Sequence, residues 1–283
     1  MNHPESIRIG VTGASGFIGS HLMTALKGHG KVVTLSRNGS LPTTAQLKNF
    51  ASGVELVFHL GGINRGTDEE ILTGNITGTL RLIEAIRKYG KPSAKMLFAS
   101  STQVYRLKKT GEKIPELTSL QPDSIYGVSK KSAEDLIRIS GLPHTVLRLA
   151  NVYGPGCRPN YNSVVATLCQ RARKKLPLQI NGKGSQGRDF IYIDDVIQAF
   201  LLAGFNGKSQ ERKFYNVSSG RITTLKKIIN TIKQTEKGIK VEFNVEGEDK
   251  VSYCCDSMRF KRDFGWKPRT SLSQGIERSL KSF

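Results

Sequence analysis

Runs of apolar residues alternate with helix-periodic segments through the first half of the chain. Continuous Val-, Ile- and Leu-rich runs are typical of strands that are buried on both faces of a parallel sheet. Apolar residues that recur every three or four positions are typical of the helices that cover such a sheet. This order predicts an α/β fold with a doubly wound parallel sheet. The predicted strands are 7–12, 32–35, 56–60, 96–100 and 145–149, and the predicted helices are 17–26, 76–89 and 128–139.

The composition changes beyond Gly154, where Gly, Pro and Asn become more frequent. We therefore expect a first domain over residues 1–153 and a smaller C-terminal lobe over residues 154–283. A segment at about 188–220 is expected to return to the first domain, so a clean division into two domains is an approximation.

A glycine-rich string, TGASGFIGS, follows the first predicted strand and opens the first predicted helix. Gly13 permits the tight turn out of the strand, and Gly16 lets the backbone approach a phosphate group. Gly19 permits close packing of the helix on the sheet. A glycine triplet alone is a weak signal, but its place between a strand and a helix predicts binding of a dinucleotide pyrophosphate at the helix N-terminus.

A second string, YGVSK, places Tyr126 and Lys130 one helical turn apart. A tyrosine is a poor acid or base at neutral pH, and a neighbouring ammonium group favours its phenolate form. Ser101 stands at the end of a predicted buried strand, where active residues of open α/β sheets gather. The three residues predict a site in which Tyr126 moves a proton while a nicotinamide moves a hydride.

Together these motifs resemble the extended short-chain dehydrogenase/reductase family, in its sugar-nucleotide branch. The resemblance runs along essentially the whole chain and implies a Rossmann domain with a C-terminal substrate-binding lobe. It also implies an NAD(P) cofactor, a UDP-sugar or other nucleotide-sugar substrate, and a homodimer. The further matching segments are VFHLGG (57–62), NITGTLRLIEA (75–85), LRLANVYGPG (147–156), RDFIYIDDV (188–196), YNVSSG (215–220) and FGWKPRTSLSQGI (264–276).

The resemblance assigns roles to residues of this chain. The expected catalytic residues are Ser101, Tyr126 and Lys130. The expected cofactor-binding residues are Gly13, Ser15, Gly16, Phe17, Ile18, Gly19, Ser36, Arg37, Asn38, Leu60, Gly61, Gly62, Asn75, Ser100, Tyr126 and Lys130. The expected substrate-binding residues are Thr102, Asn151, Asn160, Tyr161, Asn162, Ser163 and Arg188, of which Arg188 is expected to bind the nucleotide diphosphate.

The cofactor is predicted from the residues after the second strand, where an NAD enzyme usually has an Asp or Glu on the adenosine ribose. This chain has Ser36, Arg37 and Asn38 there and no carboxylate. An arginine at this place pairs with the 2′-phosphate of NADP(H), which is therefore favoured over NAD(H). The alternative is that Arg37 faces solvent.

The reaction is predicted from the residues beside the catalytic serine. Thr102 and Gln103 replace the Asp-Glu pair of the 4,6-dehydratases, and they cannot act as general acid and base. The segments RDFIYIDDV and NVYGPG resemble those of 4-epimerases, and 4-epimerisation is therefore the leading interpretation. HLGGINR and CRPNYNSVVATLC instead resemble NADPH-dependent reductases of 4-keto-6-deoxy-sugar nucleotides in capsule and O-antigen precursor synthesis. A silent NADP(H)-binding regulator is a third alternative, which the intact Ser-Tyr-Lys triple disfavours.

Composition and charge limit which partners, metal sites and locations are expected for this chain. The chain of 283 residues carries a formal charge of +20 but has no helix-turn-helix or aromatic-interleaved basic motif, so no nucleic-acid partner is expected. The basic surface instead attracts anionic ligands. Four cysteines and five histidines without metal-ligand spacing predict no disulfide framework and no metal site. The lack of a membrane-length apolar run or a signal-peptide pattern predicts a cytoplasmic protein without membrane insertion.

Overall fold

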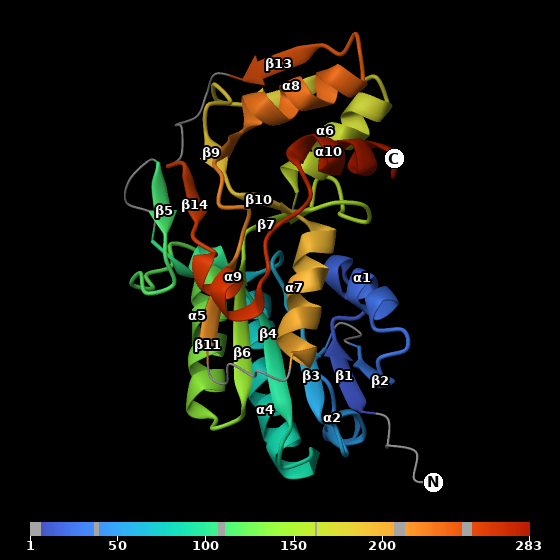
Figure 1. The fold of residues 1–283 in the computed structure, drawn as a ribbon, viewed down its shortest axis with the longest axis vertical. Coiled ribbons are helices and arrows are strands. Elements are labelled where there is room, and N and C mark those ends of the chain that lie inside the picture. Colours follow the sequence, from blue (N-terminus) through green and yellow to red (C-terminus); the bar gives the residue numbers. More distant parts are fainter. Residues whose placement is uncertain (1–6, 37–39, 107–110, 162, 207–212, 245–250) are drawn as a thin grey trace. The chain divides into compact units, whose positions relative to one another are not determined.

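The computed structural model describes residues 7–36, 40–106, 111–161, 163–206, 213–244 and 251–283. Its main feature is a six-stranded sheet with the strand order β11-β6-β4-β3-β1-β2 (Figure 1). The α/β fold with a parallel sheet that the sequence predicted is confirmed. The chain forms two compact units, which are described one at a time: residues 1–106, 119–148 and 199–215 make the first, and 107–118, 149–198 and 216–283 make the second.

The first unit contains most of the sheet and the helices that cover it. Its strands are β1 (Arg8–Thr12), β2 (Lys31–Leu35), β3 (Leu56–His59), β4 (Lys95–Ser101) and most of β6 (His144–Leu149), and β11 (Lys213–Val217) begins in it. Its helices are α1 (Phe17–Ala25), α2 (Thr44–Ala51), α3 (Asp68–Leu72), α4 (Gly78–Tyr89) and α5 (Ile125–Ile139), with the end of α7 (Ile193–Phe205). A π-helical turn, η1 (Thr73–Thr77), precedes α4, and a 3-10 turn, η2 (Thr102–Val104), follows β4.

The register of the central strands aligns their carboxyl ends. β1 pairs in parallel with β2 and β3, and β3 pairs in parallel with β4. Thr12 lies opposite His59, and His59 lies opposite Phe98, so these three residues form one row across the sheet. All four residues of β3 are buried, as a strand covered on both faces requires.

Helix α5 begins three residues earlier than the apolar periodicity predicted. Ser124 accepts a hydrogen bond from the Gly127 N–H at its N-cap, and this contact starts the helix at Ile125. In α4, Leu82 and Ile86 pack into the core, whereas Leu80 is 39% exposed. Large apolar side chains of α5 are exposed as well, namely Ile125, Val128 and Ile139.

Within the described residues, the second unit contains four two-stranded sheets and a group of helices. β7 (Asn151–Tyr153) pairs with β10 (Phe190–Tyr192), β8 (Leu178–Asn181) with β13 (Val241–Asn244), and β5 (Glu112–Ile114) with β14 (Tyr253–Cys255), all in parallel. β9 (Gly187–Arg188) and β12 (Thr223–Thr224) are antiparallel. Helices α6 (Val164–Arg173), α8 (Leu225–Thr235) and α10 (Leu272–Leu280) pack on one another, and α9 (Met258–Phe264) follows β14. Trp266 is buried and donates its indole N–H to the Asp195 carbonyl at 3.1 Å.

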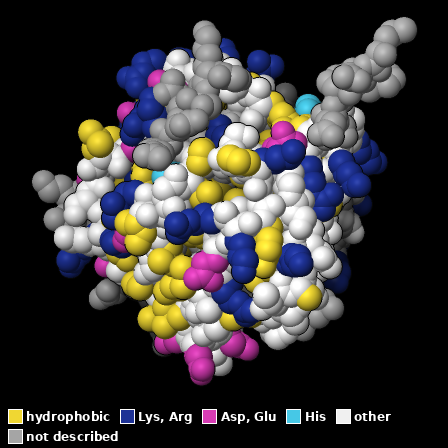
Figure 2. Space-filling model, turned by 90° about the horizontal axis from the view of Figure 1, so that it is seen from below, with side chains coloured by type: hydrophobic (Ala, Val, Ile, Leu, Met, Phe, Trp, Pro, Cys, Tyr) yellow, Lys and Arg dark blue, Asp and Glu magenta, His cyan; other side chains and the backbone are white. Residues whose placement is uncertain are grey.

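Charged side chains are spread over the surface. On the face shown in Figure 2, Lys and Arg side chains lie scattered among uncharged ones, with few acidic side chains between them. Within the residues that the structure describes, no helix is both long enough and apolar enough to cross a membrane.

Candidate functional site

The turn between β1 and α1 has the backbone geometry that a pyrophosphate needs. Gly13 has a φ of 71°, and a Cβ there would lie 2.7 Å from the Gly61 nitrogen. A Cβ at Gly19 would collide with the Gly13 carbonyl. Gly16 is exposed and forms the N-cap of α1 without a side-chain hydrogen bond. The first N–H groups of α1 therefore have no side-chain cap, and this end of the helix fits a bound phosphate group.

Gly127 allows the first turn of α5 to approach the end of β4. A Cβ at Gly127 would run into the carbonyl oxygen of Gln103, which belongs to η2 directly after Ser101. The first turn of α5 therefore packs against the backbone that follows Ser101. Tyr126 precedes Gly127 in that turn, so this residue belongs to the part of α5 that approaches the segment after Ser101.

Lys130 is buried at the centre of the first unit. Its Nζ donates a hydrogen bond to the Ala99 carbonyl at 2.9 Å and lies 5.8 Å from the centre of the Tyr126 ring. Burial lowers the pKa of Lys130 to about 8, although the charge of Glu134 acts in the opposite direction. Burial raises the pKa of Tyr126 to about 12. The phenol is thus protonated at neutral pH and can donate its proton to an oxygen of a ligand.

Asn75 joins the loop after β3 to helix α5. Its side-chain oxygen accepts from the Ile63 N–H at 2.7 Å, and its amide nitrogen donates to the Ile63 carbonyl at 2.8 Å. The same nitrogen donates to the Ser129 hydroxyl, which in turn donates to the Tyr126 carbonyl at 2.8 Å. A Cβ at Gly62 would lie 3.1 Å from the Asn75 oxygen and 3.2 Å from Lys130 Nζ. The 60–62 loop, Asn75 and Lys130 are therefore immediate neighbours.

A buried ion pair fixes α5 against the strands. Arg148 on β6 donates from Nη2 to one oxygen of Glu134 at 2.7 Å and from Nε to the other at 3.0 Å. The Ser100 hydroxyl also donates to Glu134, and Arg148 Nη1 donates to the Tyr105 hydroxyl at 2.8 Å. The Glu134 and Arg148 side chains are only 2% and 4% exposed. Ser100 adjoins Ser101 on β4. The hydrogen bond from Ser100 to Glu134 therefore links β4 to α5, the helix that carries Tyr126 and Lys130.

Several expected cofactor residues lie at the same carboxyl edge of the sheet. Ser36 directly follows β2 and is exposed, and residues 60–62 directly follow β3. Arg37 and Asn38 lie outside the described residues. Ser100 and Thr102 are both buried, and Ser100 bonds to Glu134.

In the second unit, Arg188 lies against backbone oxygens. Its Nη1 donates to the Gly187 carbonyl at 2.8 Å and to the Val251 carbonyl at 2.6 Å. The guanidinium also lies 5.5 Å from the centre of the Tyr253 ring. Arg188 is half-buried, and these contacts orient its guanidinium group.

Asp189 is a fully buried carboxylate beside Arg188. Its oxygens accept hydrogen bonds from the Ser219 N–H and hydroxyl and from the N–H groups of Gly220 and Cys255. Burial raises the pKa of Asp189, and these hydrogen bonds act against that rise. The Asn151 side chain donates to the Asp189 carbonyl at 2.9 Å. The carboxylate therefore holds together the segments that carry Arg188 and the Ser219 turn.

The expected substrate turn at 160–163 has local structural roles. Ser163 caps α6 by accepting from the Ala166 N–H at 3.3 Å. Asn160 has a φ of 57°, and its N–H donates to the Thr167 hydroxyl at 2.8 Å. Tyr161 is 38% exposed, and Asn162 lies outside the described residues.

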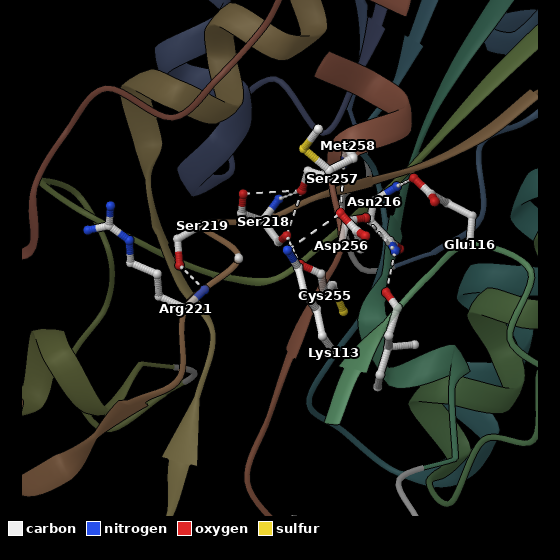
Figure 3. Close-up of polar contacts among 12 residues, drawn as sticks. Lys113, Glu116, Asn216, Ser218, Ser219, Arg221, Cys255, Asp256, Ser257 and Met258 are labelled. Carbon is white, nitrogen blue, oxygen red and sulfur yellow. Dashed lines mark hydrogen bonds and ion pairs between the residues drawn. The ribbon is translucent and has the colours of Figure 1, made fainter. Parts of the chain in front are cut away.

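A polar network around Asn216 joins three segments of the second unit (Figure 3). Its amide nitrogen donates to the carbonyls of Ile114 and Asp256, and its backbone N–H donates to Glu116. The Ser218 hydroxyl donates to the Cys255 carbonyl at 2.8 Å. The YNVSSG segment thus connects β5 with β14.

Sequence reasoning did not single out some of these residues. Glu134 stands four positions after Lys130, so the helical spacing of Tyr126, Lys130 and Glu134 was a usable signal. His59, within VFHLGG, and Asp189, within RDFIYIDDV, gave no signal that separates them from ordinary buried residues. In the part of the chain that the structure describes, no group of three or more potential metal ligands is found.

The chain is similar to known proteins in both sequence and fold. The sequence model of the NAD dependent epimerase/dehydratase family matches residues 9–218. A UDP-2-acetamido-2,6-beta-L-arabino-hexul-4-ose reductase of Pseudomonas aeruginosa is 35% identical over 69% of this chain, a match that spans 49% of the reductase. The chain thus spans about half the length of that relative.

Two solved structures share the fold over nearly the whole chain. The UDP-glucuronic acid 4-epimerase of Bacillus cereus, in complex with UDP-glucuronic acid and NAD, is 26% identical with a TM-score of 0.85. The protein RMD of Pseudomonas aeruginosa, complexed with NADPH, is also 26% identical with a TM-score of 0.85. Both matches cover 98% of each chain.

The parallel sheet and the glycine-rich turn after β1 are those of a Rossmann fold. The chain belongs to the NAD dependent epimerase/dehydratase family. The expected family resemblance is thereby confirmed.

Replacement of Glu134 by Gln is expected to move the alkaline limb of kcat/KM to lower pH. The carboxylate opposes the effect of burial on Lys130, whose pKa is about 8, so its loss lowers that pKa further. We expect the charged form of Lys130 to be the active one, so activity should fall as pH rises through this pKa. The pH profile of kcat/KM measures the shift.

Asp135→Asn is the matched control for this variant. Asp135 is the next residue on the same helix but is only half-buried and pairs with Lys131. Loss of the Asp135 carboxylate should leave the alkaline limb of the kcat/KM profile in place. Circular dichroism verifies folding of the Glu134 variant, because removal of one partner of a buried ion pair destabilises by about 3–5 kcal/mol. An unchanged limb in a folded Glu134→Gln enzyme would contradict the assignment.

Proposed function

We propose that this protein is an NAD(P)-dependent enzyme that oxidises and reduces C4 of a nucleotide-diphosphate sugar, with 4-epimerisation as the leading reaction. The observation that carries the proposal is the joint burial of Lys130 between Ala99, the Tyr126 ring and Gly62, at the edge where the glycine-rich turn opens. A bound nicotinamide would supply the hydride acceptor and donor. The side chains of this chain supply the proton transfer.

Tyr126 is the proposed general acid and base. Hydride transfer at C4 creates or removes charge on the C4 oxygen, so a hydrogen-bond donor must already face it. Tyr126 is protonated when it meets a keto sugar, and its proton passes to the oxygen as the hydride arrives at carbon. In the reverse direction the charge of Lys130 favours the phenolate that receives the proton. Ser101 is proposed to hydrogen-bond the same oxygen.

Reduction of a 4-keto-6-deoxy-sugar nucleotide with NADPH is the second candidate. The reductase of Pseudomonas aeruginosa, at 35% identity, supports it. The high pKa of Tyr126 also suits a reduction, since the phenol begins as a proton donor. A silent NADP(H)-binding regulator is less well supported, because such a protein needs no buried Lys130 beside Tyr126.

Tyr126→Phe is expected to lower kcat by at least ~10²-fold, the usual size of a lost general acid–base contribution. The assay incubates the protein with UDP-sugars and either NAD or NADPH and detects epimerised or reduced products. Turnover with a tightly retained dinucleotide that is not consumed identifies an epimerase, and stoichiometric consumption of NADPH identifies a reductase. Tyr89→Phe, at the far end of α4, is the control. Near-normal turnover of Tyr126→Phe would rule out Tyr126 as the proton donor.

We propose NADP(H) as the preferred cofactor, on the charge of Arg37 and the lack of a carboxylate at residues 36–38. Arg37→Ala should weaken NADPH binding by roughly tenfold or more, as expected for charged hydrogen bonds to a 2′-phosphate. NADH affinity should barely change and serves as the internal control, with fluorescence titration as the measurement. Equal weakening of both, or tighter NADH binding by the unmodified protein, would mean that Arg37 faces solvent.

Arg188 is proposed to bind the diphosphate of the substrate, with Asn151 and residues 160–163 shaping the rest of that subsite. The backbone carbonyls of Gly187 and Val251 engage only Nη1 of its guanidinium. Arginine can meet a diphosphate with two parallel N–H bonds. Arg188→Ala should therefore raise the dissociation constant of UDP roughly tenfold or more.

Isothermal titration with UDP measures this effect of Arg188. The control is Arg173→Ala, in the same unit, which removes an exposed arginine that pairs with the mostly buried Glu236, and Lys175 still pairs with that carboxylate. A normal UDP affinity together with a lowered melting temperature would assign Arg188 a purely structural role.

The protein is also proposed to be a homodimer that pairs through α4 and α5. Leu80, Ile125, Val128 and Ile139 leave large apolar side chains exposed on these two helices. Such side chains would be buried in a two-fold interface, in which each helix meets its copy or its neighbour.

A further inference from the structure

His59 is a buried polar residue that the proposed chemistry does not use. It ends β3, directly before the 60–62 loop, and is 6% exposed. Its Nδ1 lies 2.7 Å from the Thr12 hydroxyl, and its Nε2 lies 2.9 Å from the Thr79 hydroxyl. Its ring rests on that of Phe98, with 5.2 Å between centroids. One imidazole thus bridges the end of β1 and helix α4.

The neighbouring hydrogen bonds fix which nitrogen carries the proton. The Thr79 hydroxyl donates its only hydrogen to the Asn75 carbonyl at 2.6 Å, so it can only accept from His59. Nε2 must therefore be the N–H of the imidazole. In a neutral ring Nδ1 is then an acceptor, and the Thr12 hydroxyl donates to it.

The chain of bonds continues into the loop after β3. The Thr12 oxygen accepts the Gly61 N–H at 2.9 Å. The hydrogen bonds consequently all point the same way along the chain. Gly61 donates to Thr12, Thr12 to His59, His59 to Thr79, and Thr79 to the Asn75 carbonyl, so each proton is used once. A charged imidazole would put a second donor against Thr12 and reverse that hydroxyl. Burial, with the charge of Lys130 next, lowers the pKa of His59 to about 3, which keeps the ring neutral.

The loop held in this way lies between two parts of the proposed cofactor site. On one side, a Cβ at Gly13 would lie 2.7 Å from the Gly61 nitrogen. On the other, a Cβ at Gly62 would lie 3.2 Å from Lys130 Nζ. A small shift of the loop therefore presses on the glycine-rich turn or on Lys130. The far end of the chain of bonds, Asn75, holds Ile63 and Ser129.

We propose that neutral His59, with its proton on Nε2, is a positioning residue that sets the place of the 60–62 loop between the dinucleotide turn and Lys130. The inference rests on the proposed binding of a nicotinamide dinucleotide in the first unit. It assigns His59 no contact with the reacting atoms. Its loss should raise the dissociation constant of the cofactor more than it lowers kcat at saturating cofactor.

The first test is the tautomer of His59 in the unmodified protein. A two-bond ¹H–¹⁵N correlation spectrum of histidine-labelled protein at neutral pH should show hydrogen on Nε2 and none on Nδ1. Hydrogen on Nδ1, or on both nitrogens, would overturn the proposed direction of the chain of bonds. This measurement needs neither cofactor nor substrate, so its result is independent of the proposed function.

The second test compares variants by fluorescence titration with NADPH and NADH. His59→Phe keeps a ring against Phe98 but removes both hydrogen bonds, and it should weaken binding of the preferred cofactor by roughly tenfold. Thr12→Val should weaken it similarly, whereas Thr12→Ser, which keeps the hydroxyl, should bind almost normally. His144→Phe, which replaces a buried histidine at the start of β6, is the matched control and should retain normal affinity.

The outcomes separate the two proposals. Normal cofactor affinity in His59→Phe and Thr12→Val would overturn the positioning role and leave the proposed function intact. Absence of dinucleotide binding by the unmodified protein would overturn the proposed function and, with it, the role of His59 in cofactor binding. If His59→Phe fails to fold, the Thr12 pair decides, because valine removes only the hydroxyl and serine removes only the methyl group.

Discussion

The close approach of the backbone segments that follow β1 and β3 constrains the rest of the first unit. β1 and β3 end side by side, and β4 runs on past them to Ser101. A Cβ at Gly13 would lie 2.7 Å from the Gly61 nitrogen, and a Cβ at Gly61 would lie 2.9 Å from the Thr12 hydroxyl. Neither position has room for a side chain unless its neighbours shift. Lys130 then fills the space beside Gly62, and its position depends on how α5 is held. The buried Glu134–Arg148 pair holds that helix, and removal of either partner would leave an uncompensated buried charge.

Polar residues that are buried in pairs or chains link this edge together. The chain through His59 fastens the loop after β3, and the chain through Asn75 and Ser129 ends on the Tyr126 carbonyl. A buried hydroxyl or amide that loses its partner is penalised by its full desolvation, so each link favours one geometry. The second unit uses the same device, since Asp189 and Asn216 gather backbone donors and acceptors from segments distant in sequence.

The strands, the glycine turn and the family were predictable because they depend on local patterns. Apolar runs give β1, β3 and β4 to within a residue or two, and TGASGFIGS needs only its own spacing. Hydrogen bonds between residues distant in sequence leave no such local pattern. His59 lies in an apolar run and looks like a packed core residue, and its hydrogen-bond partners lie 47 and 20 positions away. Ser163, predicted as a ligand contact, caps α6, since a serine before a helical run serves both purposes equally well in sequence.

The two candidate reactions differ in the fate of the cofactor after the hydride transfer. An epimerase keeps its reduced cofactor and returns the hydride to the other face of the sugar, whereas a reductase releases its oxidised cofactor. The proposed roles of Tyr126, Lys130 and Ser101 are the same in both reactions, so these groups do not distinguish them. The distinction must come from how firmly the dinucleotide and the sugar are held. Epimerisation leads as a proposal because RDFIYIDDV and NVYGPG resemble segments of 4-epimerases, and measured retention or release of the dinucleotide would decide between the two reactions.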